Sequence, residues 1–87
     1  MRWLFIINPT AGKVDASVSL MPRIRAAAAR AGIEPSIVVT RHAGHAREIT
    51  AACAESGEEV RVYACGGDGT MNEVLQAAAG KERIAVG

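Results

Sequence analysis

The sequence VRVYACGGDGTMNEV occupies residues 60–74. Its first six residues are mostly β-branched or otherwise apolar, which is typical of a short buried strand. Three glycines in the next four positions end that strand sharply, and a helical pattern runs from Thr70 to Ala79. A strand, a tight glycine turn and a helix in this order predict a β-α unit of an α/β protein.

The same alternation continues toward both termini. Apolar runs predict strands at residues 3–7, 33–40 and 84–86, and helical periodicity predicts helices at residues 17–31 and 45–56. The order is βαβαβαβ, with connections long enough for right-handed crossovers. We therefore predict a three-layer, Rossmann-like α/β fold, in which helices cover both faces of one parallel sheet.

Each predicted helix carries an apolar stripe and is followed by a glycine that ends it. Pro22 is expected in or near the first turn of its helix, because deeper inside it would remove a backbone hydrogen bond. The stripes predict the following inward-facing residues: Leu20, Ile24, Ala27, Ala28 and Ala31; Ala46, Ile49, Ala52 and Cys53; Met71, Val74, Leu75 and Ala78.

The composition excludes several classes of protein. The chain has 87 residues, 49% of them hydrophobic, and a net charge of +1, which indicates one small domain. Three aromatic residues and the absence of a basic run argue against nucleic-acid binding. The apolar run at 3–7 is shorter than a signal peptide needs, and no stretch could span a membrane. Cys53 and Cys65 are expected to be buried thiols in the cytoplasm.

Ligands of open parallel sheets bind beyond the carboxyl ends of the strands, where this chain has loops at 8–15, 40–44 and 66–70. The glycines of the third loop would let backbone N–H groups approach an anion, and the following helix points its positive end there. Asp68 would repel phosphate, unless it holds Mg²⁺ or positions a hydroxyl group or water. The alternative is a glycine-rich turn that Asp68 stabilises locally.

Neither standard phosphate motif fits the glycines. A P-loop around Gly12 would need glycine and Ser/Thr where Ile7 and Val14 stand, and a dinucleotide fingerprint starting at Gly67 would need glycine at Asn72.

Other polar residues near these loops have structural interpretations. Thr70 and Glu73 have the spacing of a capping box, Asn8 could form an Asx turn, and Lys13 alone is best read as exposed. His42 and His45 could ligate a metal, but we expect no acidic or Cys partner close by in sequence. A solvated loop is therefore preferred, and no metal ligand is assigned.

The block Gly66–Val74 resembles the central signature of the diacylglycerol kinase catalytic-domain family, and Asn8–Lys13 is similar to the opening of that family. Val38–Thr40 with Gly44–Ala46 resembles the segment between them. The resemblance implies transfer of the γ-phosphoryl group of ATP to a lipid hydroxyl with Mg²⁺, and Asp68 as the acidic, catalytic group. It implies nucleotide contacts at Asn8, Pro9, Thr10, Ala11, Gly12, Thr40, Gly66, Gly67, Asp68, Gly69, Thr70, Met71, Asn72 and Glu73.

The resemblance also implies that residues 1–87 are the N-terminal ATP-binding part of such a domain, without its β-rich lipid-binding part. We therefore expect weak ATP or ADP binding and no lipid phosphorylation by this chain alone. The parent would contact the inner membrane surface peripherally at most, and the sheet edge at 84–86 could pair in a dimer. Alternatives are an NAD kinase-like enzyme and a non-catalytic nucleotide-binding or interaction module.

Overall fold

A computed structural model describes residues 1–9 and 16–87 of the chain; for residues 16 and 17 it describes the backbone only. The elements are β1 (Arg2–Ile7), α1 (Ala16–Ala31), β2 (Pro35–Val39), α2 (His45–Ser56), β3 (Val60–Cys65), α3 (Asp68–Ala78) and β4 (Ile84–Val86). The predicted βαβαβαβ order is confirmed.

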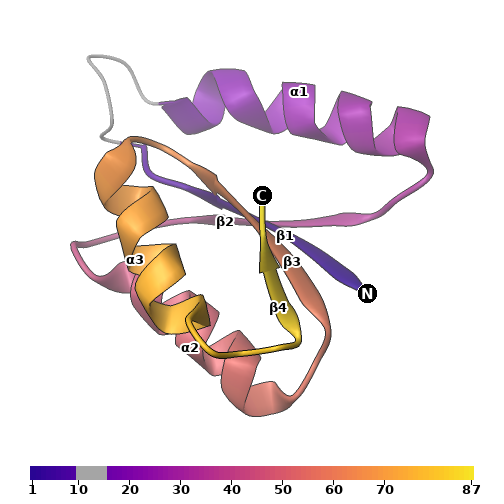
Figure 1. Cartoon of the computed structure of the whole chain (residues 1–87). Coiled ribbons are helices and arrows are strands. Elements are labelled where there is room, and N and C mark those ends of the chain that lie inside the picture. Colours follow the sequence, from indigo (N-terminus) through magenta and orange to yellow (C-terminus); the bar gives the residue numbers. More distant parts are fainter. Residues whose placement is uncertain (10–15) are drawn as a thin grey trace.

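The four strands form one sheet in the order β2-β1-β3-β4, and every neighbouring pair is parallel. In Figure 1, α1 lies on one face of the sheet, while α2 and α3 lie together on the other. The predicted three-layer architecture is therefore confirmed. The register aligns Ile7 with both Val39 and Cys65, so β1, β2 and β3 end at the same level. Asn8 and Pro9 after β1 consequently lie beside the loops that follow β2 and β3.

The core lies between the sheet and the pair α2–α3. Alternate residues of β1 and β3 point to this side, and Leu4, Ile6, Val60 and Val62 are fully buried there. Helix α3 adds Val74, and α2 adds Cys53. This shared core holds the starts of α2 and α3 at fixed positions along the carboxyl edge of the sheet.

The other face of the sheet carries the aromatic residues. Phe5 and Tyr63 stack with ring centroids 4.7 Å apart, and Trp3 stacks on Tyr63 at 6.4 Å. These three side chains are half-buried, because α1 covers only part of this face.

Two details of the predicted helices are wrong. Pro22 lies inside α1, which runs from Ala16 to Ala31, rather than in or near its first turn. The helix therefore continues past the proline without the backbone hydrogen bond that its missing N–H would have donated. The predicted apolar stripes also include four residues that are not buried. Each of these lies beside the buried side of its helix rather than on it: Ala27, Ala31, Ala52 and Leu75.

Within residues 1–9 and 16–87, no helix combines the length and the hydrophobicity that a membrane crossing requires.

Candidate functional site

A cavity of about 470 Å³ opens at the carboxyl edge of the sheet. It is lined by residues from all three loops and from the helices that follow two of them: Asn8 and Pro9; Thr40, Arg41, His42, Ala43 and Ala46; Gly67, Gly69, Thr70 and Glu73. The loops were predicted to meet at this edge, and the aligned strand ends explain why they do.

The glycine turn before α3 leaves its backbone amides available. Gly66, Gly67, Asp68 and Gly69 are all exposed. The first amides of a helix have no partner within it, and no turn or cap bond in the described residues is donated by the amides of residues 66–70. An added Cβ at Gly67 or Gly69 would meet no atom within 4 Å. A ligand can therefore approach this stretch of main chain closely.

Gly66 has a different role, which is close packing. An added Cβ there would lie 2.7 Å from Thr70 Oγ1 and 2.9 Å from Asn8 Cβ. The first loop approaches the third at this point, where the Asn8 amide donates to the Cys65 carbonyl over 2.9 Å. Gly66 thus lets the loops after β1 and β3 come together.

Two threonines form buried parts of the lining. Thr40 is 9% exposed, and its amide donates to the Ile7 carbonyl over 2.8 Å. Thr70 is 4% exposed in the first turn of α3. Both backbones are thereby fixed at the carboxyl edge.

The structure brings only some of the predicted site residues into the cavity lining. Asn8, Pro9, Thr40, Gly67, Gly69, Thr70 and Glu73 line it, whereas Gly66, Asp68, Met71 and Asn72 do not. Asp68 is exposed in the first turn of α3, beside the lining residues. Thr10, Ala11, Gly12, Lys13 and the remainder of the Asx turn expected at Asn8 fall outside the described residues.

The predicted capping box is wrong. Helix α3 begins at Asp68, so Gly67 takes the N-cap position and no side chain caps the helix. Thr70 lies inside the first turn instead. Glu73 Oε1 accepts a hydrogen bond from the Arg47 amide over 3.4 Å, at the start of α2.

This contact supplies α2 with a cap from another helix. The N-cap residue of α2, Gly44, has φ 85° and no side chain that could bond the first turn. The Glu73 carboxylate takes that place, and its negative charge suits the positive end of α2. The sequence could not reveal this role, because the two partners are 26 positions apart.

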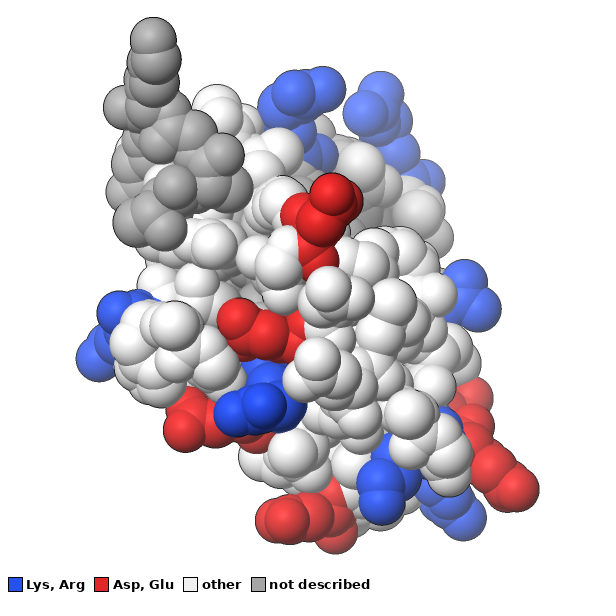
Figure 2. Space-filling model, turned by 60° about the vertical axis from the view of Figure 1, so that its left-hand side comes forward, with Lys and Arg blue, Asp and Glu red and all other residues white. Residues whose placement is uncertain are grey.

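The second loop contributes residues that sequence reasoning missed. Arg41, His42, Ala43 and Ala46 line the cavity together with Thr40. Their position after β2 was the only available signal. Figure 2 shows acidic and basic side chains interspersed over the face turned forward, rather than gathered into a patch of one sign.

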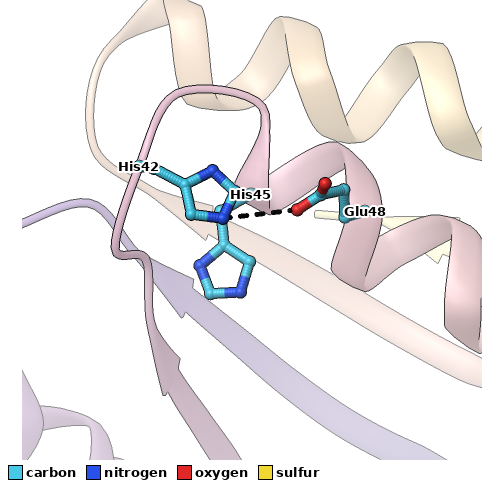
Figure 3. Close-up of side chains that lie close together, drawn as sticks. All are labelled: His42, His45 and Glu48. Carbon is cyan, nitrogen blue, oxygen red and sulfur yellow. Dashed lines mark ion pairs between the residues drawn. The ribbon is translucent and has the colours of Figure 1, made fainter.

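The expectation that His42 and His45 lack an acidic partner close in sequence is also wrong. Glu48 lies three positions after His45, one turn further along α2, and its Oε2 is 3.4 Å from His42 Nε2 (Figure 3). Helical spacing places residues i and i+3 on the same face, which brings the carboxylate to the imidazoles.

Burial raises the pKa of both cysteine thiols. Cys53 is 5% exposed and Cys65 half-buried, and in both the loss of hydration disfavours the thiolate. For Cys53, the Arg2 charge opposes this shift and the Glu58 charge adds to it. Both thiols are free; Cys53 is buried as predicted, whereas Cys65, at the end of β3, is only half-buried.

The fold and the cavity together define an α/β protein with an open cavity at the carboxyl edge of a parallel sheet. A family model described as the diacylglycerol kinase catalytic domain matches residues 2–87. The chain is 37% identical over 80 residues to a diacylglycerol kinase of Staphylococcus saprophyticus, covering 92% of this chain and 26% of that protein. It is 35% identical over 78 residues to a diacylglycerol kinase of Staphylococcus carnosus, covering 90% and 25%.

A solved structure has the same fold. The crystal structure of a diacylglycerol kinase from Bacillus anthracis matches with a TM-score of 0.67 and 28% identity, over 98% of this chain and 31% of that one. The chain therefore belongs to the diacylglycerol kinase catalytic-domain family. It spans about a quarter of the length of the curated relatives it matches.

Proposed function

We propose that this chain is the nucleotide-binding part of an ATP-dependent lipid kinase, and that the cavity at the carboxyl edge receives the phosphates of ATP. The observation that carries the proposal is the exposed turn Gly66–Gly69, whose amides are uncommitted at the start of α3. Several N–H groups directed at one place, together with the helix dipole, form a site for phosphate oxygens.

Residues of the first two loops would hold the rest of the nucleotide. Asn8 and Pro9 would border it from the first loop and Thr40 from the second. Thr10, Ala11 and Gly12, which follow Pro9 in the sequence, would add further contacts. Gly66 would act through loop packing rather than direct contact. Met71 and Asn72 are weaker candidates, since neither lines the cavity.

Asp68 fits the role of an acidic group beside the transferred phosphate. Its carboxylate is exposed at the start of α3 and forms no ion pair with the described residues. Magnesium in kinase sites is held by one or two carboxylates together with phosphate oxygens and water. Asp68 can supply one such oxygen ligand, whereas Glu73 Oε1 is already bonded to the Arg47 amide. When bound, Mg²⁺ would neutralise charge on the phosphates.

The lipid acceptor would be bound by the rest of a longer protein. Diacylglycerol is the acceptor class that the names of the relatives suggest. We further propose that residues 1–87 bind nucleotide weakly and do not phosphorylate lipid by themselves. The family match favours a lipid kinase over the NAD kinase-like alternative.

Calorimetry with Mg·ADP tests the phosphate site. The Gly67→Val variant should lose at least about tenfold in affinity, because a branched side chain would stand between the amides and the phosphate. The variant should stay folded, since Gly67 has an extended backbone (φ −101°) and open space around it.

Two further variants complete the experiment. Asp68→Ala should weaken binding of Mg·ADP more than binding of ADP without Mg²⁺, because the carboxylate is proposed to act through the metal. Glu82→Gln, at an exposed position between α3 and β4, serves as the charge-matched control and should bind like the unmodified chain. Undiminished binding by a folded Gly67→Val variant would remove the basis of the proposal.

A further inference from the structure

A cluster of three potential metal ligands lies at the start of α2 and belongs to none of the roles above. His42 stands in the loop after β2, His45 is the first residue of α2, and Glu48 lies one turn further along that helix (Figure 3). One ligand atom from each residue lies within 4.8 Å of the other two. The imidazole rings are stacked, with centroids 4.6 Å apart.

The hydrogen bonds of His42 fix which ring nitrogen is available. Nδ1 lies 2.9 Å from the Ala43 carbonyl oxygen, which only accepts, so Nδ1 carries the proton. If the ring is neutral, Nε2 is then unprotonated, and its lone pair faces Glu48 Oε2, 3.4 Å away. Two acceptors at this distance repel each other, unless a proton or a cation lies between them. An imidazole whose other nitrogen donates to a backbone carbonyl is also the usual arrangement of a metal-binding histidine.

The distances suit a tetrahedral ion. Donors about 2.0–2.1 Å from Zn²⁺ and at tetrahedral angles are roughly 3.3–3.4 Å from one another. The observed 3.4 Å between His42 Nε2 and Glu48 Oε2 agrees with this spacing. The 4.8 Å bound on the other pairs means that a shift of the His45 ring by roughly 1–2 Å would complete the set.

One existing bond has to change for this to happen. His45 Nδ1 accepts a hydrogen bond from the Arg41 amide over 2.9 Å. If the metal takes Nδ1, it replaces that amide. If the metal takes Nε2, the proton moves to Nδ1, which can no longer accept. In both cases the Arg41 amide loses its partner, which gives a local signature of binding.

We propose that His42, His45 and Glu48 bind a borderline divalent transition-metal ion such as Zn²⁺. Two imidazoles and one carboxylate match the preferences of Zn²⁺ rather than those of Mg²⁺, which favours oxygen ligands throughout. Three protein ligands leave the fourth tetrahedral position open to water or another ligand. His42 also lines the cavity, so the ion would lie at its rim. This site is separate from the proposed Mg²⁺ role of Asp68.

Calorimetric titration of the whole chain with ZnCl₂, without nucleotide, tests the proposal. We expect one Zn²⁺ per chain, and unchanged binding in the presence of excess Mg²⁺. His42→Ala and Glu48→Gln should each lower the affinity at least about tenfold. Both residues are exposed, so these variants should keep the far-ultraviolet circular dichroism of the folded chain. Glu55→Gln, an exposed carboxylate on α2, is the matched control and should bind normally.

The Arg41 amide gives an independent readout. Its NMR resonance should shift on addition of Zn²⁺ in the unmodified chain and stay in place in His42→Ala. Unchanged affinity in His42→Ala and Glu48→Gln, or the absence of any 1:1 binding, would overturn the proposal. Because nucleotide is not present, failure here leaves the proposed nucleotide function untouched.

Discussion

The same small substitution should have very different effects on stability at two adjacent glycines. A methyl group at Gly66 would lie 2.7 Å from Thr70 Oγ1, 2.9 Å from Asn8 Cβ and 3.3 Å from Thr70 Cβ. The first two distances are too short for any real Cβ, so the first loop or the first turn of α3 has to move. At Gly67, the same methyl group would meet nothing within 4 Å.

The magnitudes follow from packing. Forcing an extra methyl group into a filled space costs typically about 1–3 kcal/mol. We therefore expect Gly66→Ala to lower the free energy of unfolding by about 1–3 kcal/mol, or the Tm by about 4–8 °C for each kcal/mol. Gly67→Ala should lower the free energy of unfolding by only about 0.5–1 kcal/mol, because alanine is a poorer N-cap residue than glycine but its methyl group would meet no atom there.

Urea unfolding followed by far-ultraviolet circular dichroism measures both values. A double-mutant cycle with Thr70→Ala isolates the contact, because removing Oγ1 should relieve part of the cost of Gly66→Ala. Equal stability of Gly66→Ala and Gly67→Ala would refute the reasoning, since it would mean that the loops after β1 and β3 do not meet at Gly66.

Four further predictions concern the helix contacts, the core and the cysteines. Glu73→Ala should lower the free energy of unfolding by about 0.5–1 kcal/mol through loss of the cap on α2, with a smaller effect at high salt, measurable by urea unfolding. Val74 is fully buried, so Val74→Ala should lower the free energy of unfolding by at least about 1.5 kcal/mol in the same assay. Leu75 is 48% exposed, so Leu75→Gln should lower it by about 0.5 kcal/mol or less. Similar losses in the two variants would mean that α3 buries a different face. Ellman's reagent should modify Cys53 more slowly than Cys65, and both more slowly than free cysteine, because burial raises both pKa values. The same raised pKa values mean that the stability from keeping these thiols protonated is present below about pH 9 and is lost as pH rises through the folded-state pKa values.

Most of the fold could be predicted from local patterns. Short stretches rich in apolar residues marked all four strands, and glycines marked the ends of the helices, because both signals come from neighbours in sequence. The details that failed depend on tertiary contacts. Leu75 was placed by an idealised stripe, which cannot show how much of a helix its neighbours cover. Pro22 was placed by a local rule for proline in helices, which the rest of α1 overrides.

The candidate site divides in the same way. That the three loops share one edge follows from a parallel sheet, and the glycines of the third loop could be read directly. The role of Glu73 could not be read from the sequence, because its carboxylate accepts a hydrogen bond from the Arg47 amide of a different helix. The pairing of His45 with Glu48 follows from helical spacing, whereas the approach of His42 to Glu48 depends on how the loop before α2 folds.

The most direct test of the central claim is a titration of the ¹⁵N-labelled chain with Mg·ADP, followed amide by amide. The account predicts that the largest shifts fall on the amides of residues 67–70, with smaller ones at Asn8 and Thr40. Saturable binding that leaves the amide resonances of residues 67–70 unshifted would contradict it, because the nucleotide would then be bound without the main chain at the start of α3.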